Sequence, residues 1–238
     1  MSELIQYITD PANTFADHTR DTILLCLVPI ALALLIALPL GVLVARRPIT
    51  AFLAANVSGL IRAIPTLAVL FVMVLFLKQI CFTPSVIALT ALGVPPILLN
   101  VIAGLRGVDP AAIDAARGMG MTRLQVLARV ELPLVLPVAA AGVRSAAVQI
   151  VATVPLAALI GGGGYGDYIL KGLADEVHAT DLFVGAFSVA LLALLTEAIF
   201  ALAQRAVTPA GLRAGLQAAG AGAAIGPTEA EAPREKAA

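Results

Sequence analysis

The chain has 238 residues, of which 60% are hydrophobic and only 13% are charged, and its mean hydropathy is +0.99. Because soluble domains carry about a quarter charged residues, a chain this apolar is expected to be embedded in a lipid bilayer. Its formal net charge of zero gives no general attraction to nucleic acid, and its two cysteines are too few for a zinc site.

Five segments are long and apolar enough to cross a bilayer, which takes about 20 residues in a helix. In chain order these segments are 22–45, 57–77, 84–105, 134–160 and 182–203. Their polarity does not alternate as it does in the strands of a membrane β-barrel. The predicted fold class is therefore all-α, a polytopic membrane bundle of about five transmembrane helices.

The charges predict how the chain lies in a cytoplasmic (plasma) membrane. Arginines and lysines, Arg62 among them, gather on the side of the loop 107–133, whereas only Arg20, Lys78 and Lys171 fall on the other side. Since cytoplasmic loops are rich in these residues, the N-terminus is predicted outside and the C-terminus inside. The domains follow as an extracytoplasmic segment 1–21, a transmembrane domain 22–205 and a cytoplasmic, disordered tail 206–238.

The loop 107–133 begins with the signature of a short helix. Asp109 is a good N-cap and Pro110 suits the first helical position, which predicts a helix as far as Arg117. Gly118 and Gly120 are expected to end it, because glycine adopts the left-handed conformation at little cost.

A second short helix is predicted in the same loop. Thr122 can cap it, it would run to Leu132, and Pro133 is expected to mark the turn into the next span. Two short helices of this kind could dock on another protein or could be an ordinary loop, and the local pattern leaves both interpretations open.

The spacing of this loop resembles a known motif. Asp114-Ala115-Ala116 is followed after three residues by Gly120, and after nine more by Val130-Glu131-Leu132-Pro133. This is similar to the EAA loop of the permeases of binding-protein-dependent ABC importers (type I), with Asp114 in place of glutamate and Val130 in place of isoleucine. In that family the loop is the coupling helix, seated in a cleft of the ATPase subunit.

The resemblance extends over most of the chain. Segments 38–46 and 61–68 are similar to the family's core spans, and 115–122, 130–134, 141–144 and 158–167 look most like the glycine betaine/carnitine/choline (osmoprotectant) branch. Tyr165 stands where that branch usually has leucine. Methionine permeases share the scaffold, so they remain an alternative, as does a secondary transporter of small amines.

The resemblance implies the partners of the chain. A type I importer contains a second permease, identical or not, two ATPase subunits and an extracytoplasmic substrate-binding protein. ATP and magnesium would bind the ATPases, and no cofactor is expected in this chain. The sequence itself contains no Walker A motif and no nucleophile–base set. The chain is therefore expected not to be an enzyme, and ATP hydrolysis is expected on the ATPase subunits. The residues assigned to ATPase coupling are Asp109, Asp114, Ala115, Ala116, Gly118, Gly120, Leu132 and Pro133.

A glycine-rich turn follows the fourth span. It consists of Gly161, Gly162, Gly163, Gly164 and Gly166, and it matches the pattern G-x-G-x-x-G. A dinucleotide site would need that pattern between a strand and a helix of a βαβ unit. Here it follows a membrane span, so we expect an outer turn that moves with the gate and contacts a docked binding protein.

Polar residues within the spans are the remaining candidates. Asn100, Gln149 and Thr153 could line a translocation path, although hydrogen bonding between helices would explain them equally well. Ionisable groups in a membrane usually find a partner. Glu197 is therefore predicted to pair with Arg144 or Arg62 near the cytoplasmic end of the bundle, unless both arginines extend to the lipid headgroups.

Overall fold

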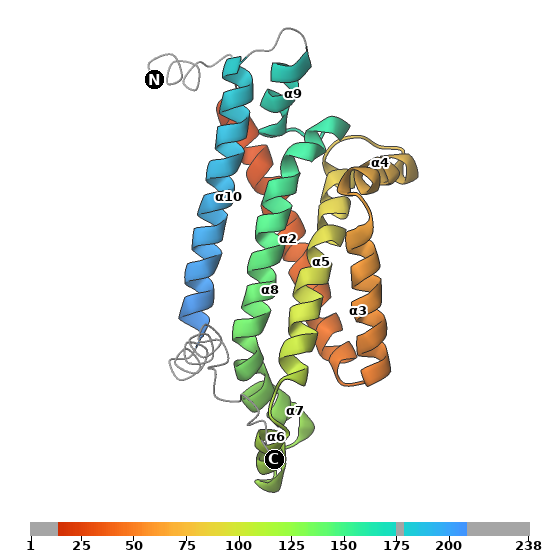
Figure 1. Cartoon of the computed structure of the whole chain (residues 1–238), viewed down its shortest axis with the longest axis vertical. Coiled ribbons are helices and arrows are strands. Elements are labelled where there is room, and N and C mark those ends of the chain that lie inside the picture. Colours follow the sequence, from red (N-terminus) through yellow and green to blue (C-terminus); the bar gives the residue numbers. More distant parts are fainter. Residues whose placement is uncertain (1–13, 175–178, 209–238) are drawn as a thin grey trace, which may run out of the picture.

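The structure is a computed structural model that describes residues 14–174 and 179–208. Within these ranges the ordered elements are all helices, and four of them are long and apolar enough to cross a membrane. They are α2 (Phe15–Ala45), α5 (Phe82–Arg106), α8 (Leu132–Thr153, within the longer stretch Arg123–Ile160) and α10 (Ala179–Val207). They run side by side along the long axis of the molecule (Figure 1).

The centre of the bundle lies where α2, α5 and α8 meet. Small side chains line this contact, and Ala33, Ala37 and Ala146 are completely buried. Gly142 of α8 lies so close to α5 that a Cβ placed there would be 2.7 Å from the Cβ of Asn100. Small residues let membrane helices approach closely, which is a main source of their packing energy.

The second predicted span, 57–77, is not one straight helix. Instead α3 (Pro48–Ala63) and α4 (Thr66–Leu77) form a pair bent by 91°, so the count of spans is four, or five if the pair crosses as one. The break lies at Ile64, which has an extended backbone because Pro65 follows it. By contrast, Pro29, Pro39, Pro95 and Pro96 lie inside helices that continue past them.

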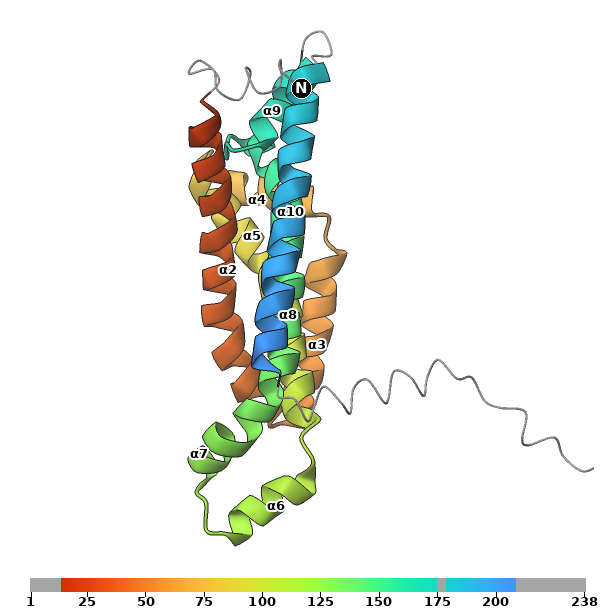
Figure 2. The same ribbon diagram turned by 90° about the vertical axis from the view of Figure 1, so that its left-hand side faces the viewer.

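The two ends of the bundle differ, and Figure 2 shows them most clearly. We call the end that carries α6 (Pro110–Gly118) and α7 (Arg123–Val126) the loop end. The opposite end carries α9 (Gly166–Ala174) and the glycine-rich turn, and we call it the glycine end. The start of α2 lies at the glycine end and the finish of α10 at the loop end (Figure 2).

The helix α2 extends beyond the predicted span 22–45. It begins at Phe15 and so includes residues 15–21, and the hydroxyls of Thr19 and Thr22 donate hydrogen bonds to carbonyls one turn back. The tail from 209 onward and the first thirteen residues lie outside the described residues. Their predicted locations therefore stay predictions.

Candidate functional site

The first helix of the loop forms as its sequence predicts. The Asp109 carboxylate accepts a hydrogen bond from the Ala111 backbone N–H at 2.9 Å, and Pro110 occupies the first turn. The helix extends one residue further than expected, to Gly118. Gly120 then has a φ of +82°, which turns the chain toward the second helix.

The second helix is capped as predicted but ends differently. Thr122 and Gln125 form a reciprocal capping box at the start of α7. A π-helical turn, Leu127–Glu131, then leads into α8 without a break, so the expectation that Pro133 marks a turn is wrong. In the wider π turn the Leu132 N–H donates a hydrogen bond to the Leu127 carbonyl. The helix can therefore continue through Pro133, which has no N–H to donate.

The residues of the EAA-like motif lie on two faces of α6. Asp114, Ala115 and Gly118 are not buried, whereas Ala116 is buried beneath the loop with 2% of its surface accessible. Beside the outer face, Met119 and Leu124 are 72% and 74% exposed. Exposed apolar residues at the tip of a loop are typical of a surface that another protein covers.

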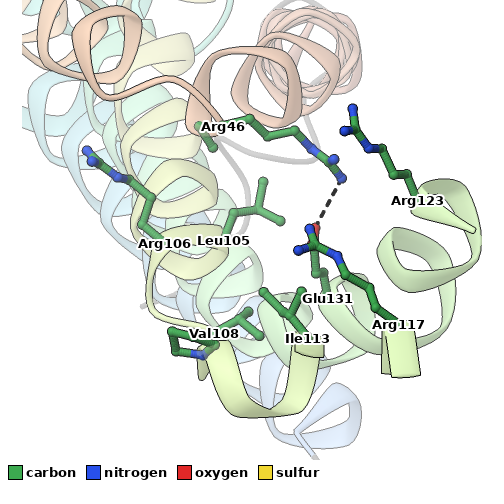
Figure 3. Close-up of a pocket in the computed structure, with 10 residues that line it drawn as sticks. Arg46, Leu105, Arg106, Val108, Ile113, Arg117, Arg123 and Glu131 are labelled. Carbon is green, nitrogen blue, oxygen red and sulfur yellow. Dashed lines mark hydrogen bonds and ion pairs between the residues drawn. The ribbon is translucent and has the colours of Figure 1, made fainter. Parts of the chain in front are cut away.

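Behind the loop lies a cavity of about 470 Å³ with a strongly basic lining. Figure 3 shows Arg46, Arg117 and Arg123 reaching into the space around Glu131. Arg46 Nη2 lies 3.3 Å from Glu131 Oε2, and the Glu131 side chain is only 12% exposed. This contact joins the end of α2 to the π turn, and the sequence analysis did not predict it.

A second polar site lies within the membrane-spanning part, in a groove of about 430 Å³ between α8 and α10. There Arg144 Nη2 donates a hydrogen bond to Glu197 Oε1, and Arg144 Nη1 donates another to Gln204 Oε1 at 3.3 Å. Of the two arginines predicted as partners of Glu197, Arg144 is therefore the one that pairs with it.

Arg62 does not lie where it was expected. It is in the last turn of α3, about 20 Å along the helix from Arg47 at the loop end, since each residue rises 1.5 Å. The helix α3 packs against α5 and α2, on the side of the molecule away from α10 (Figure 1). Its assignment to the side of the loop was therefore wrong, because Arg62 lies at the far end of α3 from the loop end, and of the two predicted partners of Glu197 only Arg144 is within reach.

The three polar candidates for a path have different environments. Gln149 lines the groove between α8 and α10. Asn100 donates from Nδ2 to the Pro96 carbonyl at 2.8 Å, and Thr153 donates from Oγ1 to the Gln149 carbonyl at 2.6 Å. Both of these side chains thus find hydrogen-bond partners within their own helices. Of the three, only Gln149 lines a groove that also contains charged groups.

The glycine-rich turn is packed against the start of α2. A Cβ on Gly164, whose φ is +83°, would be 2.6 Å from Thr22 Oγ1, and the Tyr165 N–H donates to that same hydroxyl at 2.9 Å. The Tyr165 hydroxyl also lies 2.9 Å from Thr19 Oγ1. This leucine-to-tyrosine departure from the family pattern therefore ties the turn to α2.

Beside the turn, His18 and Asp167 lie in contact, with Nδ1 3.6 Å from Oδ2. His18, only 14% exposed, also packs edge-on against Tyr168. Burial raises the pKa of Asp167, although His18 and Lys171 oppose the rise, and burial raises the pKa of Tyr168 to about 12. Among the described residues, no three His, Cys, Asp or Glu side chains are grouped to hold a metal.

Comparison with known proteins identifies the family. Residues 37–209 match the family described as "Binding-protein-dependent transport system inner membrane component". The chain belongs to this family. It is accordingly a multi-pass protein of the inner, or plasma, membrane and a permease subunit of an ABC transporter.

Curated relatives cover nearly the whole chain. The choline transport system permease protein OpuBB of Bacillus subtilis is 33% identical, covering 90% of this chain and 97% of that protein. The carnitine transport permease protein OpuCB of Listeria monocytogenes is 34% identical, with the same coverage. The osmoprotectant import permease protein OsmW of Salmonella typhimurium is 33% identical, covering 89% of this chain and 100% of that protein.

Solved structures of ABC transporter chains share the fold. A chain of the MetNI methionine ABC transporter in an inward-facing conformation matches with a TM-score of 0.74 at 24% identity, covering 88% of this chain and 100% of that one. A chain of an amino acid ABC transporter with histidines matches with a TM-score of 0.69 at 17% identity, covering 86% and 97%. At these identities the likeness establishes the helical permease fold alone.

Proposed function

We propose that this chain is the permease through which an ATP-driven importer moves quaternary-ammonium osmoprotectants, of the kind of glycine betaine, carnitine and choline. The observation that carries the proposal is the loop 107–133. It presents Asp114 and Ala115 beside the exposed apolar side chains of Met119 and Leu124. The names of the curated relatives favour this solute class over methionine.

The loop end is the cytoplasmic side in this proposal, with the N-terminus outside and the C-terminus inside. Arg46, Arg47 and Arg106 flank the helices there, as expected of a cytoplasmic face. The complete transporter would contain a second permease subunit, two ATPase subunits that bind ATP and magnesium, and an extracytoplasmic binding protein. The glycine end would face that binding protein.

Motion would pass from the loop to the groove through one continuous element. The helix runs without a break from α7 through the π turn into α8, and Arg144 lies on it, about 30 Å from Leu124 at 1.5 Å per residue. A movement of the loop against the ATPase would therefore tilt α8. Because Arg144 contacts Glu197, α10 would follow.

The competing function is a secondary transporter driven by an ion gradient. Such proteins use acidic residues within the membrane as ion sites. Glu197 is the acidic residue in the middle part of α10 and is paired with Arg144, and a single paired carboxylate is little support for coupling to an ion gradient. A loop with an exposed docking face would also have no role in such a transporter.

The test is to express the chain together with the ATPase and the binding protein of its own transporter, and to purify the complex through a tag on the permease. The ATPase should co-purify. Uptake of labelled glycine betaine, carnitine, choline and methionine should then show competition among the three quaternary amines and none from methionine. Competition by methionine alone would replace the proposed substrate class with the alternative one.

A further inference from the structure

The groove between α8 and α10 has polar walls within the membrane-spanning part of both helices. Glu197 is ten residues before the end of α10, or about 15 Å from the loop end, and Arg144 is twelve residues into α8, or about 18 Å. Both side chains therefore lie more than two helical turns inside the membrane-spanning helices. Gln149 and Ser145 lie on the same face of α8.

This face is not fully covered by the chain itself. The side chains of Arg144 and Glu197 are 37% and 38% exposed, and Ser145 is exposed. Charged groups at this depth avoid lipid and turn toward the bundle interior or a water-filled cavity. The groove must therefore face water or protein in the assembled transporter, whereas the opposite face of α10, which includes Ile199 at 63% exposure, is apolar.

The chemistry of the groove matches a zwitterion. A guanidinium binds a carboxylate through two parallel N–H donors. A quaternary ammonium has no N–H to donate, so it needs only a negative charge within reach, which the Glu197 carboxylate supplies. Serine and glutamine add neutral hydrogen-bonding groups beside Arg144. No aromatic ring is among the described residues that line the groove, so binding would be weak enough for release.

We propose that the Arg144–Glu197 pair opens around a zwitterionic solute in transit. Arg144 takes the solute carboxylate and Glu197 takes its quaternary ammonium. This inference rests on the proposed function and assigns the substrate site within it. One internal ion pair is exchanged for two solute–protein pairs, so neither member of the pair is left without a partner inside the membrane during the exchange.

The same exchange disfavours a solute that is only a cation. Choline can replace Arg144 at Glu197, but it offers no carboxylate to the guanidinium. Arg144 would then keep only its 3.3 Å hydrogen bond to Gln204. Glycine betaine and carnitine should therefore occupy the groove more readily than choline, by up to about fivefold given that the pair is partly solvated.

The test measures occupancy without the binding protein. The complex of permease and ATPase is placed in lipid nanodiscs, with Cys81, the exposed native cysteine, changed to serine. The variant Ser145→Cys then reports on the groove through the rate at which its new thiol reacts with a charged, water-soluble reagent. The variant Ile199→Cys, on the opposite face of α10, is the matched control.

We expect the thiol of Ser145→Cys to react and the thiol of Ile199→Cys not to react. Glycine betaine should slow the reaction in Ser145→Cys in a concentration-dependent way, and choline should need up to about five times the concentration for the same effect. An unreactive thiol in Ser145→Cys would show that protein fills the groove, and reaction without protection would show that no solute binds there. Either result overturns the proposal.

Two further variants distinguish binding of the solute by the Arg144–Glu197 pair from a purely structural contact between α8 and α10. In Arg144→Gln the advantage of glycine betaine over choline should disappear, whereas a brace between helices would leave that ratio unchanged. If this variant does not assemble, Arg144→Gln combined with Glu197→Gln leaves no unpaired charge and should lose protection by both solutes. ATP-dependent uptake by the unmodified complex tests the proposed function separately. The proposed substrate site can therefore be disproved while the proposed function stands.

Discussion

Arg46 and Glu131 join two parts of the chain that are 85 residues apart in sequence, with Arg46 Nη2 3.3 Å from Glu131 Oε2. Arg46 follows the last turn of α2, and Glu131 ends the π turn that leads into α8. The pair therefore connects the end of α2 to the π turn through which the loop continues into α8. A tilt of the loop would move α2 and α8 together.

Glu131→Gln should reduce coupling more than stability. The variant keeps the size of the side chain and loses its charge, and because Arg46 is 44% exposed the loss of stability should be about 1 kcal/mol or less. Uptake per ATP hydrolysed should fall. Arg129→Gln, at an exposed position of the same turn, is the control and should keep the ratio. Equal effects of the two substitutions on uptake per ATP hydrolysed would show that the Arg46–Glu131 pair has no special role in coupling.

Gly120→Ala should impair the loop through its backbone. A side chain at a φ of +82° costs about 1–2 kcal/mol, although no atom lies within 4 Å of the added methyl group. Gly118→Ala adds the same methyl group in equally open space at a helical position. Uptake should therefore fall further for Gly120→Ala, while both variants reach the membrane in normal amounts. The opposite order would contradict a conformational role for Gly120.

Gly142→Ala should lower the thermal stability of the purified permease. Its methyl group would lie 2.7 Å from the Asn100 Cβ and 2.8 Å from the Pro96 carbonyl oxygen, so α5 and α8 would have to separate. Overpacking of this kind costs about 1–3 kcal/mol. Gly59→Ala in α3 meets no atom within 4 Å and should be neutral or slightly stabilising. Thermal unfolding followed by intrinsic tyrosine fluorescence in detergent measures both, and an unchanged Tm for Gly142→Ala would show that this contact is loose.

Stability at the glycine end should depend on the protonation of Asp167. Its pKa is raised above the ordinary value of 3.8 by burial, so the folded state binds the proton more tightly and loses stability as pH rises from 3.8 through the raised pKa. Asp167→Asn should therefore be the more stable protein at neutral pH, with a gain that shrinks as the pH falls through that window. Thermal unfolding of both proteins across this range is the measurement. A variant that is less stable at neutral pH would mean that the contact with His18 outweighs the burial.

Hydrophobicity and local capping rules were sufficient to predict much of the fold. Asp109 and Thr122 cap the helices that they were expected to cap, because capping depends only on residues within one turn. The break at Pro65 was foreseeable as a kink, but its 91° angle depends on what α4 packs against. Pro133 was predicted to mark a turn, but the helix continues through it because a π turn precedes it.

Contacts between distant segments were harder to predict. The pair Glu197–Arg144 could be proposed because intramembrane charges are rare and need partners. Arg46–Glu131 lies at the membrane edge, where each charge could equally meet water, so the sequence held no comparable signal. His18 is mostly buried because α9 folds back over the start of α2, a contact that no local sequence pattern indicates.

Solute accumulation in proteoliposomes that contain the complete transporter and no ion gradient is the decisive measurement for an ATP-driven permease. We expect labelled glycine betaine to accumulate only when ATP and the binding protein are both present, and Gly120→Ala to lower accumulation while hydrolysis continues. Accumulation by the permease alone under a sodium or proton gradient, without the ATPase, would contradict this expectation.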